Sequence, residues 1–375
     1  MPDGDRAPAG GAAPSGDVAP AGGAVPAGGA VPAGGAVPAE GAVPAGGAVP
    51  AEGAVPAGGA VPAEGAVPAG GAVPAEGGAL LVVGDIVTDV VARYRGPLAA
   101  GTDTAAVIRT LPGGAGANVA CWAAHSGCAD VRLLGRVGAD AAQWHERELV
   151  AAGVRPRLVV DPRAATGTVI CLVDNGDAAE RTFLTDSGAS LRLEPADWSD
   201  ALLDGVARLH LSGYLLFSEP SRALVATALA AARARGVPVS LDPASAGFLT
   251  ALGVDRFLAL VEGVDVLLPS RDEACLLTGL PDPADAAAKL SRQVPLVVAK
   301  AGADGALVAR SGSVLARIPA APAMPRDTTG AGDAFTGAFL AALVAGVDAR
   351  EAAVLGCGAG ALAVERVGAR PPAHG

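Results

Sequence analysis

The strongest constraint on the fold of this chain is a repeated alternation of short aliphatic runs with alanine-rich stretches. The runs occupy residues 79–85, 131–140, 209–213, 237–242, 264–269 and 295–300. Apolar runs of this length are typical of strands that are buried on both faces. The alanine-rich stretches between them, such as 141–152 and 220–235, are long enough for helices. The alternation therefore predicts an α/β domain, in which a mainly parallel sheet is covered by helices on both faces.

Residues 1–78 have a different character, because a six-residue unit close to GGAVPA repeats through most of them. A period of six occurs in β-helices, but Pro follows each Val of the repeat and would remove a hydrogen-bond donor from every turn. The recurring Pro and Gly-Gly also oppose a helix. The unit resembles elastin-like sequence, and we expect a flexible, disordered tail that precedes one organised domain at residues 79–375.

Two segments interrupt the alternation of strands and helices, at about residues 90–111 and 155–187. Both are richer in Val, Thr and Arg, and the second contains DNGD at 174–177, which is typical of a hairpin turn. We expect them to form a small antiparallel sheet that covers a site at the carboxyl ends of the parallel strands, as a lid. Edge strands without a function are the alternative.

Charge and composition limit the possible partners. The formal net charge is −11, and an acidic chain lacks the basic face that nonspecific nucleic-acid binding requires. The longest apolar stretch, 334–347, is shorter than the roughly 20 residues that a membrane span needs. Five scattered cysteines without a C-x-x-C pair are typical of reduced thiols in a cytosolic protein. We expect a cytoplasmic protein that binds neither nucleic acid nor membrane.

The segment DTTGAGDAF, residues 327–335, could bind phosphate even though the chain lacks a P-loop motif. Gly330 and Gly332 let the backbone approach a ligand closely. The helix that follows leaves its first N–H groups unpaired and directed at that ligand. Asp333 stands in the first turn, where the helix dipole favours the ionised form, and could accept a proton from an attacking hydroxyl. A capped helix without catalytic function is the alternative.

A second glycine cluster, LPGGAGANVA at 111–120, also precedes an expected helix. Gly113 and Gly114 permit close approach of a ligand. Asn118 would present an amide that both donates and accepts hydrogen bonds, which suits a polyhydroxyl ligand. Gly-Gly before a helix is common, so this cluster by itself indicates little.

Together these motifs resemble those of the ribokinase-like (PfkB) carbohydrate kinases, over about residues 80–372. DTTGAGDAFTGAFLAAL is similar to the C-terminal signature of that family and PGGAGANVA to its N-terminal signature; GRVGAD, followed by AAGV, is a third match. The resemblance implies a ribokinase-like three-layer α/β/α fold with a small β-sheet lid. It also implies an ATP-dependent kinase that phosphorylates the hydroxymethyl group of a small sugar.

The resemblance assigns roles in the reaction to individual residues. It implies that Asp333 is the catalytic base, and that the backbone of Gly330, Ala331 and Gly332 forms an anion hole. The residues implied in sugar binding are Asp89, Gly113, Gly114 and Asn118. The residues implied in nucleotide binding are Lys300, Gly302 and Gly305, although Lys300 could instead be a surface lysine at a strand end.

The resemblance also implies two metal sites. Glu273 would act on Mg²⁺ through water, and Asp327 would help to hold a monovalent cation, K⁺ in the potassium-activated members. Ser270 stands where the family often has Asn, which puts the control of Mg²⁺ in question. Val87 and Ala115 replace residues that ribokinases often use, and both changes weaken the case for ribose itself.

Two alternatives to a sugar kinase stay open. One is a nucleoside kinase of the same family, which is disfavoured because the expected lid contains few aromatic residues to stack on a base, Tyr94 and Phe183. The other is a sensor that binds a sugar or a nucleotide without turnover. The resemblance further implies a homodimer formed through the lid.

Overall fold

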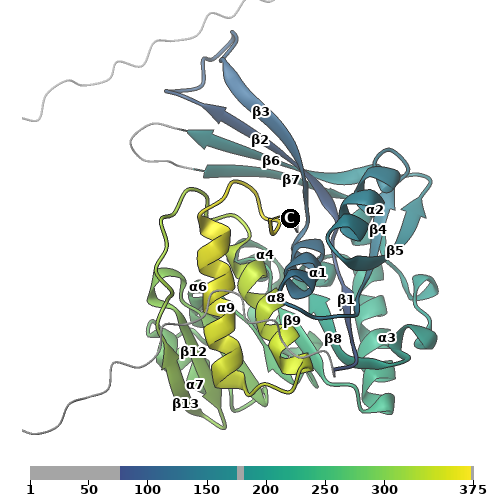
Figure 1. Ribbon diagram of the computed structural model, residues 1–375, viewed down its shortest axis with the longest axis vertical. Coiled ribbons are helices and arrows are strands. Elements are labelled where there is room, and N and C mark those ends of the chain that lie inside the picture. Colours follow the sequence, from purple (N-terminus) through teal and green to yellow (C-terminus); the bar gives the residue numbers. More distant parts are fainter. Residues whose placement is uncertain (1–76, 175–180, 373–375) are drawn as a thin grey trace, which may run out of the picture. The chain divides into compact units, whose positions relative to one another are not determined.

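The computed structural model describes residues 77–174 and 181–372, and they form two β-sheets and two layers of helices (Figure 1). The larger sheet lies between the helical layers, which confirms the predicted three-layer α/β/α fold. The described residues do not include residues 1–76 of the predicted tail or residues 175–177 of the DNGD turn. Within the described part of the chain, no helix is long and apolar enough to cross a membrane.

The main sheet has nine strands in the order β13-β12-β11-β10-β9-β8-β1-β4-β5. In this order, all neighbouring strands between β11 and β5 pair in parallel. Strands β12 and β13 extend the sheet beyond β11 as antiparallel strands. A mainly parallel sheet was predicted and is confirmed. The strand bounds are β1 Ala79–Val83, β4 Val131–Gly138, β5 Val154–Asp161, β8 Val206–Ser212, β9 Val239–Asp242, β10 Val266–Leu267, β11 Leu296–Lys300, β12 Ala306–Arg310 and β13 Ser313–Ile318.

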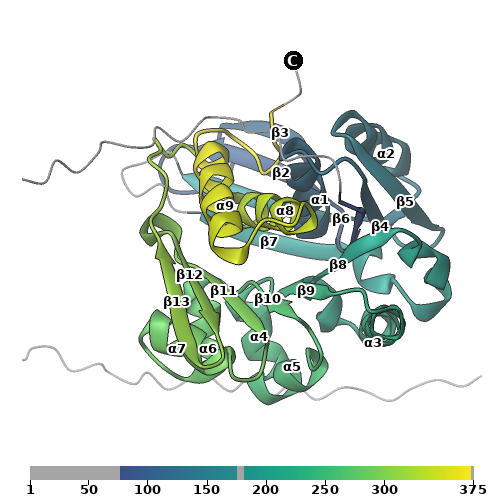
Figure 2. The same cartoon turned by 60° about the horizontal axis from the view of Figure 1, so that its bottom comes forward.

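Helices cover both faces of this sheet, as Figure 2 shows. One face carries α1 Ala115–His125, α2 Ala142–Ala151, α8 Ala331–Val344 and α9 Ala349–Val364. The other face carries α3 Glu219–Arg235, α4 Ala246–Leu252, α5 Val254–Leu260, α6 Arg271–Thr278 and α7 Pro283–Leu290.

Strand β1 shows why the aliphatic runs lack polar alternation. Leu80 and Val82 belong to the core cluster beneath α1 and α8, whereas Leu81 and Val83 belong to the cluster beneath α3. Successive side chains of a strand point to opposite faces, so a strand with a core on each side must be apolar throughout.

The smaller sheet is the predicted lid, with strand order β3-β2-β6-β7 (Figure 1). Its strands are β2 Val87–Tyr94, β3 Ala106–Gly113, β6 Thr166–Asp174 and β7 Arg181–Gly188. The two outer pairs are antiparallel, as expected, but the central pair, β2 with β6, is parallel. The lid therefore consists of two antiparallel pairs from distant parts of the sequence, joined by a parallel pair.

The predicted second lid segment began too early. Residues 155–161 belong to β5, which pairs with β4 at the edge of the main sheet. Arg155 and Arg157 are exposed there. An edge strand is only half buried, so it carries the same mixture of polar and apolar residues as a lid strand, and the sequence pattern could not separate the two.

Helices α1 and α8 pack together closely because Gly337 of α8 faces α1. A Cβ atom at Gly337 would lie 2.6 Å from the Val119 carbonyl oxygen and 2.6 Å from Trp122 Cβ. Such distances are too short for a real side chain. The absent side chain therefore sets the separation of the two helices that carry the candidate site.

We expect Gly337→Ala to lower the free energy of unfolding by about 1–3 kcal/mol, because the added methyl group overpacks the contact between α1 and α8. The matched control is Gly358→Ala on α9, where a Cβ would meet nothing within 4 Å. That change should instead raise stability by up to about 1 kcal/mol, since Ala is the better helix former. Urea unfolding at 25 °C measures both, and equal stabilities of the two variants would contradict the prediction.

Candidate active site

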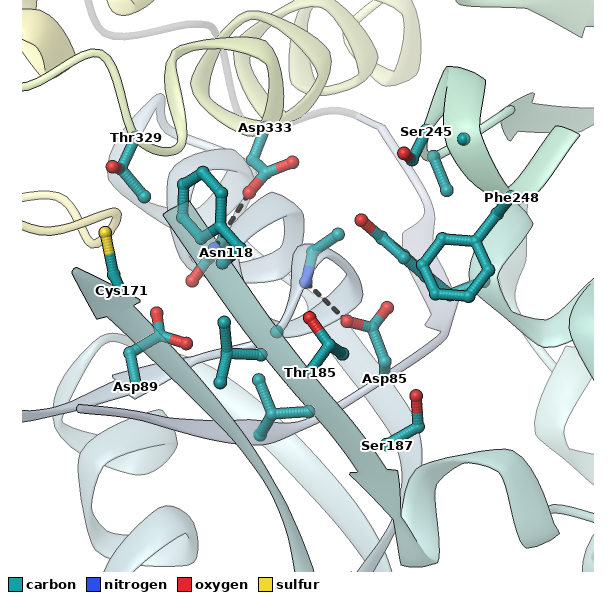
Figure 3. A pocket seen from close by; sticks show the side chains of 18 of the residues that line it. Asp85, Asp89, Asn118, Cys171, Thr185, Ser187, Ser245, Phe248, Thr329 and Asp333 are labelled. Carbon is teal, nitrogen blue, oxygen red and sulfur yellow. Dashed lines mark hydrogen bonds between the residues drawn. The ribbon is translucent and has the colours of Figure 1, made fainter. Parts of the chain in front are cut away.

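A cavity of about 830 Å³ lies between the lid and the carboxyl ends of the parallel strands (Figure 3). Val87, Asp89 and Val169 of the lid line one side. Segments that directly follow β1, β8, β9 and β10 line the other side. Most of the sugar-site and metal-site residues named from the sequence meet here with the predicted base Asp333: Asp89, Gly114, Asn118, Glu273 and Asp327.

Asp333 and Asn118 are in direct contact in this cavity. Asn118 Nδ2 donates a hydrogen bond of 2.8 Å to Asp333 Oδ2, which joins the first turns of α1 and α8 (Figure 3). Asn118 Oδ1 is buried and has no hydrogen-bond partner in the described part of the protein. A buried amide oxygen without a partner is costly, so a ligand hydroxyl that donates to it would be stabilising.

The ionisation of Asp333 differs from the expectation based on the helix dipole. Burial raises the pKa of Asp333 to about 7, the neighbouring Asp242 adds to that rise, and the hydrogen bond from Asn118 opposes it. Removal of the carboxylate from water outweighs the favourable position at the helix N-terminus. A base with a pKa near the working pH is well matched to general-base catalysis.

Asp89 is the second carboxylate that faces the cavity. Burial raises its pKa to about 6, whereas Arg370 lowers it. Gly113 lies directly behind the carboxylate, and a Cβ atom there would collide with it. Gly113 thus makes room for Asp89 and does not itself line the cavity. The two residues act as one unit, which the separate motifs did not reveal.

Asp85 is a site residue that the sequence interpretation missed. Its carboxylate accepts hydrogen bonds from the N–H groups of Ala115 at 2.7 Å and Gly116 at 3.1 Å, and from Ser212 Oγ at 2.7 Å. It therefore fixes the start of α1 against β1 and β8. An acid directly after a buried strand was the available signal, because strand carboxyl ends border the site.

Arg370 was also missed, because it follows the last helix in a stretch without a pattern. Its guanidinium donates to the carbonyl oxygens of Gly113 at 3.2 Å and Ala117 at 3.1 Å. The C-terminal segment is thereby tied to the glycine cluster that precedes α1.

A second cavity, of about 440 Å³, lies on the other side of the α8 N-terminus. It is lined by the three residues named for nucleotide binding, Lys300, Gly302 and Gly305, together with Ala331 and Gly332. Gly330 lines neither cavity. It is the N-cap of α8 with φ 74°, a left-handed conformation that favours glycine, and it packs against Ala369.

The first turn of α8 therefore separates two cavities. Asp333 faces the larger one, and the backbone of Ala331 and Gly332 borders the smaller one. Two of the three residues implied in the anion hole, Ala331 and Gly332, therefore lie at the boundary between the cavities. The third, Gly330, supports the turn as the N-cap of α8.

Glu273 is buried and has a structural role in addition to any role with metal. Ser270 and Glu273 form a capping box, in which Glu273 Oε2 accepts from the Ser270 N–H at 2.8 Å and Ser270 Oγ accepts from the Glu273 N–H at 3.2 Å. The Ser at position 270 thus holds Glu273 at the edge of the larger cavity. No group of three or more potential metal ligands occurs among residues 77–174 and 181–372.

Asp327 is surrounded by donors. Its carboxylate accepts from the N–H groups of Thr329 at 2.9 Å and Gly368 at 3.1 Å, and Arg93 of the lid lies 3.7 Å away. A monovalent cation at this carboxylate would compete with the Arg93 guanidinium.

Comparison with known proteins identifies the family. The model of the pfkB family carbohydrate kinases matches residues 79–374. The chain belongs to the pfkB family of carbohydrate kinases. It is accordingly a phosphotransferase that acts on an alcohol group, as the sequence motifs predicted.

Several members of the pfkB family are similar along most of the organised domain. A fructokinase from Klebsiella pneumoniae is 32% identical over 278 residues, which are 72% of this chain and 85% of the relative. A ribokinase from Arabidopsis thaliana is 31% identical over 314 residues, 78% of this chain and 77% of the relative. The structure of a candidate ribokinase II from Escherichia coli, solved with ATP and Mg²⁺, matches with a TM-score of 0.69 and 27% sequence identity. The match covers 78% of this chain and 94% of the Escherichia coli chain.

We expect kcat/KM to rise with pH through an apparent pKa near 7, because Asp333 is the predicted base, accepts a proton only when ionised, and has its pKa raised to about 7. Asn118→Leu removes a hydrogen bond that favours the carboxylate, so the rise should move to higher pH. The other charged groups that act on Asp333 are Asp85, Asp242 and Lys300. A pH–rate profile measured from pH 5 to 9 tests this, and an unshifted profile for the variant would contradict it.

Proposed function

We propose that this chain is an ATP-dependent kinase that phosphorylates the hydroxymethyl group of a small sugar. The observation that carries the proposal is the position of the α8 N-terminus between two cavities, with Asp333 on one side and glycine-rich backbone on the other. The larger cavity would hold the sugar, and the smaller one would hold the nucleotide. The fructokinase and ribokinase relatives, and the neighbour solved with ATP and Mg²⁺, support a sugar kinase that uses ATP.

Each group of the chain would have a defined part in the transfer. Asp89 and Asn118 would bind and orient the sugar hydroxyls, and Asp333 would take the proton of the attacking hydroxyl. The bond from that oxygen to the γ-phosphorus forms while the bond to the bridging oxygen of ADP breaks. The first N–H groups of α8 would stabilise the negative charge on the transferring group. The lid would exclude water from the cavity.

Glu273 fits the Mg²⁺ role that the family resemblance implies. Mg²⁺ usually keeps several waters and is held through one or two carboxylates together with substrate phosphates. A single buried carboxylate at the cavity edge suits that mode of binding better than a dedicated protein cage. When bound, the ion would neutralise phosphate charge.

A monovalent cation fits the chain less well. Asp327 already accepts two backbone N–H groups and lies beside the Arg93 guanidinium, which supplies a positive charge there. We derive no step of the reaction through K⁺.

The homodimer expected through the lid stays a prediction. Val90, Ile108, Ile170 and Leu184 share the face of the lid that points away from the cavity, and Ile108 and Leu184 are exposed. A second copy would cover this apolar face, and sedimentation equilibrium measures whether it does.

A panel of sugars and nucleosides, assayed by ADP release, tests the proposed function. We expect turnover with at least one small sugar, and a fall of about 10²–10⁴ in kcat for Asp333→Asn, since the amide cannot accept the proton. Asp348→Asn, at the N-cap of α9, is the matched control and should keep kcat. Ligand-induced thermal stabilisation without turnover on any substrate would instead indicate the non-catalytic sensor.

The aromatic residues that line the larger cavity support nucleosides as the second candidate class of substrate. Pairing across the lid places Val91, Cys171 and Phe183 in one row, next to the row that contains Asp89, and all three line the cavity. Tyr214 and Phe248 of the main domain also line it. The low aromatic content of the lid segments had disfavoured a nucleobase, but two of the three aromatic residues come from outside the lid.

Phe183→Ala separates these two classes of substrate. If a base stacks on Phe183, the KM for nucleosides should rise about fivefold or more, because an aromatic contact contributes about 1 kcal/mol beyond its buried area. The KM for sugars, which would bind near Asp89, should change little. The same ADP-release assay measures both, and equal changes for sugars and nucleosides would rule out a stacking role.

A further inference from the structure

The ammonium group of Lys300 lies beside the first turn of α8, which separates the two cavities. Lys300 is the last residue of β11, and its Nζ forms an ion pair with Asp242 Oδ2 at the end of β9. A Cβ atom at Gly332 would lie 3.6 Å from Lys300 Nζ, so the ammonium stands beside the first turn of α8. The Lys300 side chain is 13% exposed, and it lines the smaller cavity. This cation is thus held against the same turn whose N–H groups would face phosphate.

Asp242 is itself anchored from α8. Thr336 Oγ1 donates a hydrogen bond of 3.0 Å to Asp242 Oδ2, the same oxygen that pairs with Lys300. Thr336 is fully buried and lies one turn beyond Asp333. Helix α8, which carries the candidate base Asp333, therefore also holds Asp242, the partner of Lys300. The positions of Asp333 and Asp242 relative to each other are set by this one rigid helix.

The charges around Lys300 require it to stay protonated. Burial opposes its charge, but Asp242 and Glu273 outweigh that effect and raise the pKa of Lys300 above its ordinary value. Asp333 acts in the same direction. One positive charge thus stands among three carboxylates, at the place where a phosphate would bring further negative charge. Without that charge, repulsion in a poorly hydrated site would oppose phosphate binding and transfer.

We propose that Lys300 is a catalytic residue of the phosphoryl transfer, and that Asp242 and Thr336 are positioning residues that hold its ammonium beside the first turn of α8. This inference rests on the proposed kinase function. In the transfer, Lys300 Nζ donates a hydrogen bond to a non-bridging oxygen of the moving phosphoryl group and keeps its proton. The proton of the substrate hydroxyl passes to Asp333, and ADP leaves.

A role in nucleotide binding alone predicts a different kinetic result. A contact made equally with bound ATP and with the transition state changes KM, whereas a contact that strengthens as charge develops changes kcat. The position of Lys300 beside Gly332, at the boundary of the two cavities, favours the second result.

The decisive variants are Lys300→Met, which removes the charge but keeps the length, and Lys300→Arg, which keeps the charge. We expect Lys300→Met to lower kcat by about 10²–10³, as loss of a transition-state donor does, with both KM values changed by less than roughly threefold. Lys300→Arg should recover part of the rate. The matched control is Lys289→Met, the other lysine of the chain, whose Nζ donates to the Thr278 carbonyl oxygen on α6.

Removal of Lys300 leaves the largely buried carboxylate of Asp242 without its ion pair, which can destabilise the fold. The double variant Lys300→Met/Asp242→Asn removes both charges and provides a folded comparison, checked by its melting temperature and by ADP binding in calorimetry. It should be as slow as Lys300→Met. Thr336→Val, which leaves Lys300 intact, should lower kcat by about 10-fold, since a small misplacement of a catalytic group is costly.

The outcomes separate this inference from the proposed function. A Lys300→Met enzyme or a double variant with normal kcat, or with only the KM for ATP raised, would overturn the catalytic role and leave the kinase function intact. A wild-type protein that turns over no sugar or nucleoside would overturn the proposed function, and the inference with it.

Discussion

The close contact between α1 and α8 is the constraint on which the candidate site depends. It exists because Gly337 has no side chain where α8 crosses Val119 and Trp122 of α1. The contact brings the first turns of the two helices together, so that Asn118 reaches Asp333 at 2.8 Å. It also leaves the N-terminus of α8 between two cavities. A shift of either helix would move the candidate base Asp333, its hydrogen-bond donor Asn118 and the backbone proposed to face phosphate at once.

The second organising feature is an accumulation of carboxylates at the strand carboxyl ends. Asp85, Asp242, Glu273 and Asp333 lie close enough to influence one another, and burial makes each interaction stronger than it would be in water. Backbone N–H groups neutralise part of this charge at Asp85, and Lys300 neutralises part at Asp242. Burial, assisted by the charges of Asp242 and Asp85, raises the pKa of Asp333 toward neutrality. The same environment that makes the carboxylates costly to bury thus suits one of them for proton transfer.

The lid and the main domain line the larger cavity with different kinds of side chain. Its inner face is largely aliphatic and aromatic, with Asp89 as the carboxylate that reaches the cavity from it. The main domain supplies the groups that would act on phosphate. Under the proposed function, the lid contributes to the choice of substrate and the main domain carries the groups of the transfer. Substitutions in the lid should then change the substrate without disturbing Asp333 or Lys300.

The sequence by itself determined the layered fold, the lid and the two glycine-rich helix starts. Each of these depends on residues close together in the chain, such as Gly330 to Asp333 or Gly113 to Asn118, and local patterns report them directly. The tertiary structure alone decided which distant residues meet. Asn118 and Asp333 are separated by 215 positions, and Lys300 and Asp242 by 58. Strand order and helix packing create those pairs and the burial that shifts the pKa of Asp333, and neither is written in any local pattern. The same reason explains why residues 155–161 were assigned to the lid: only pairing with β4 distinguishes an edge strand of the main sheet from a lid strand.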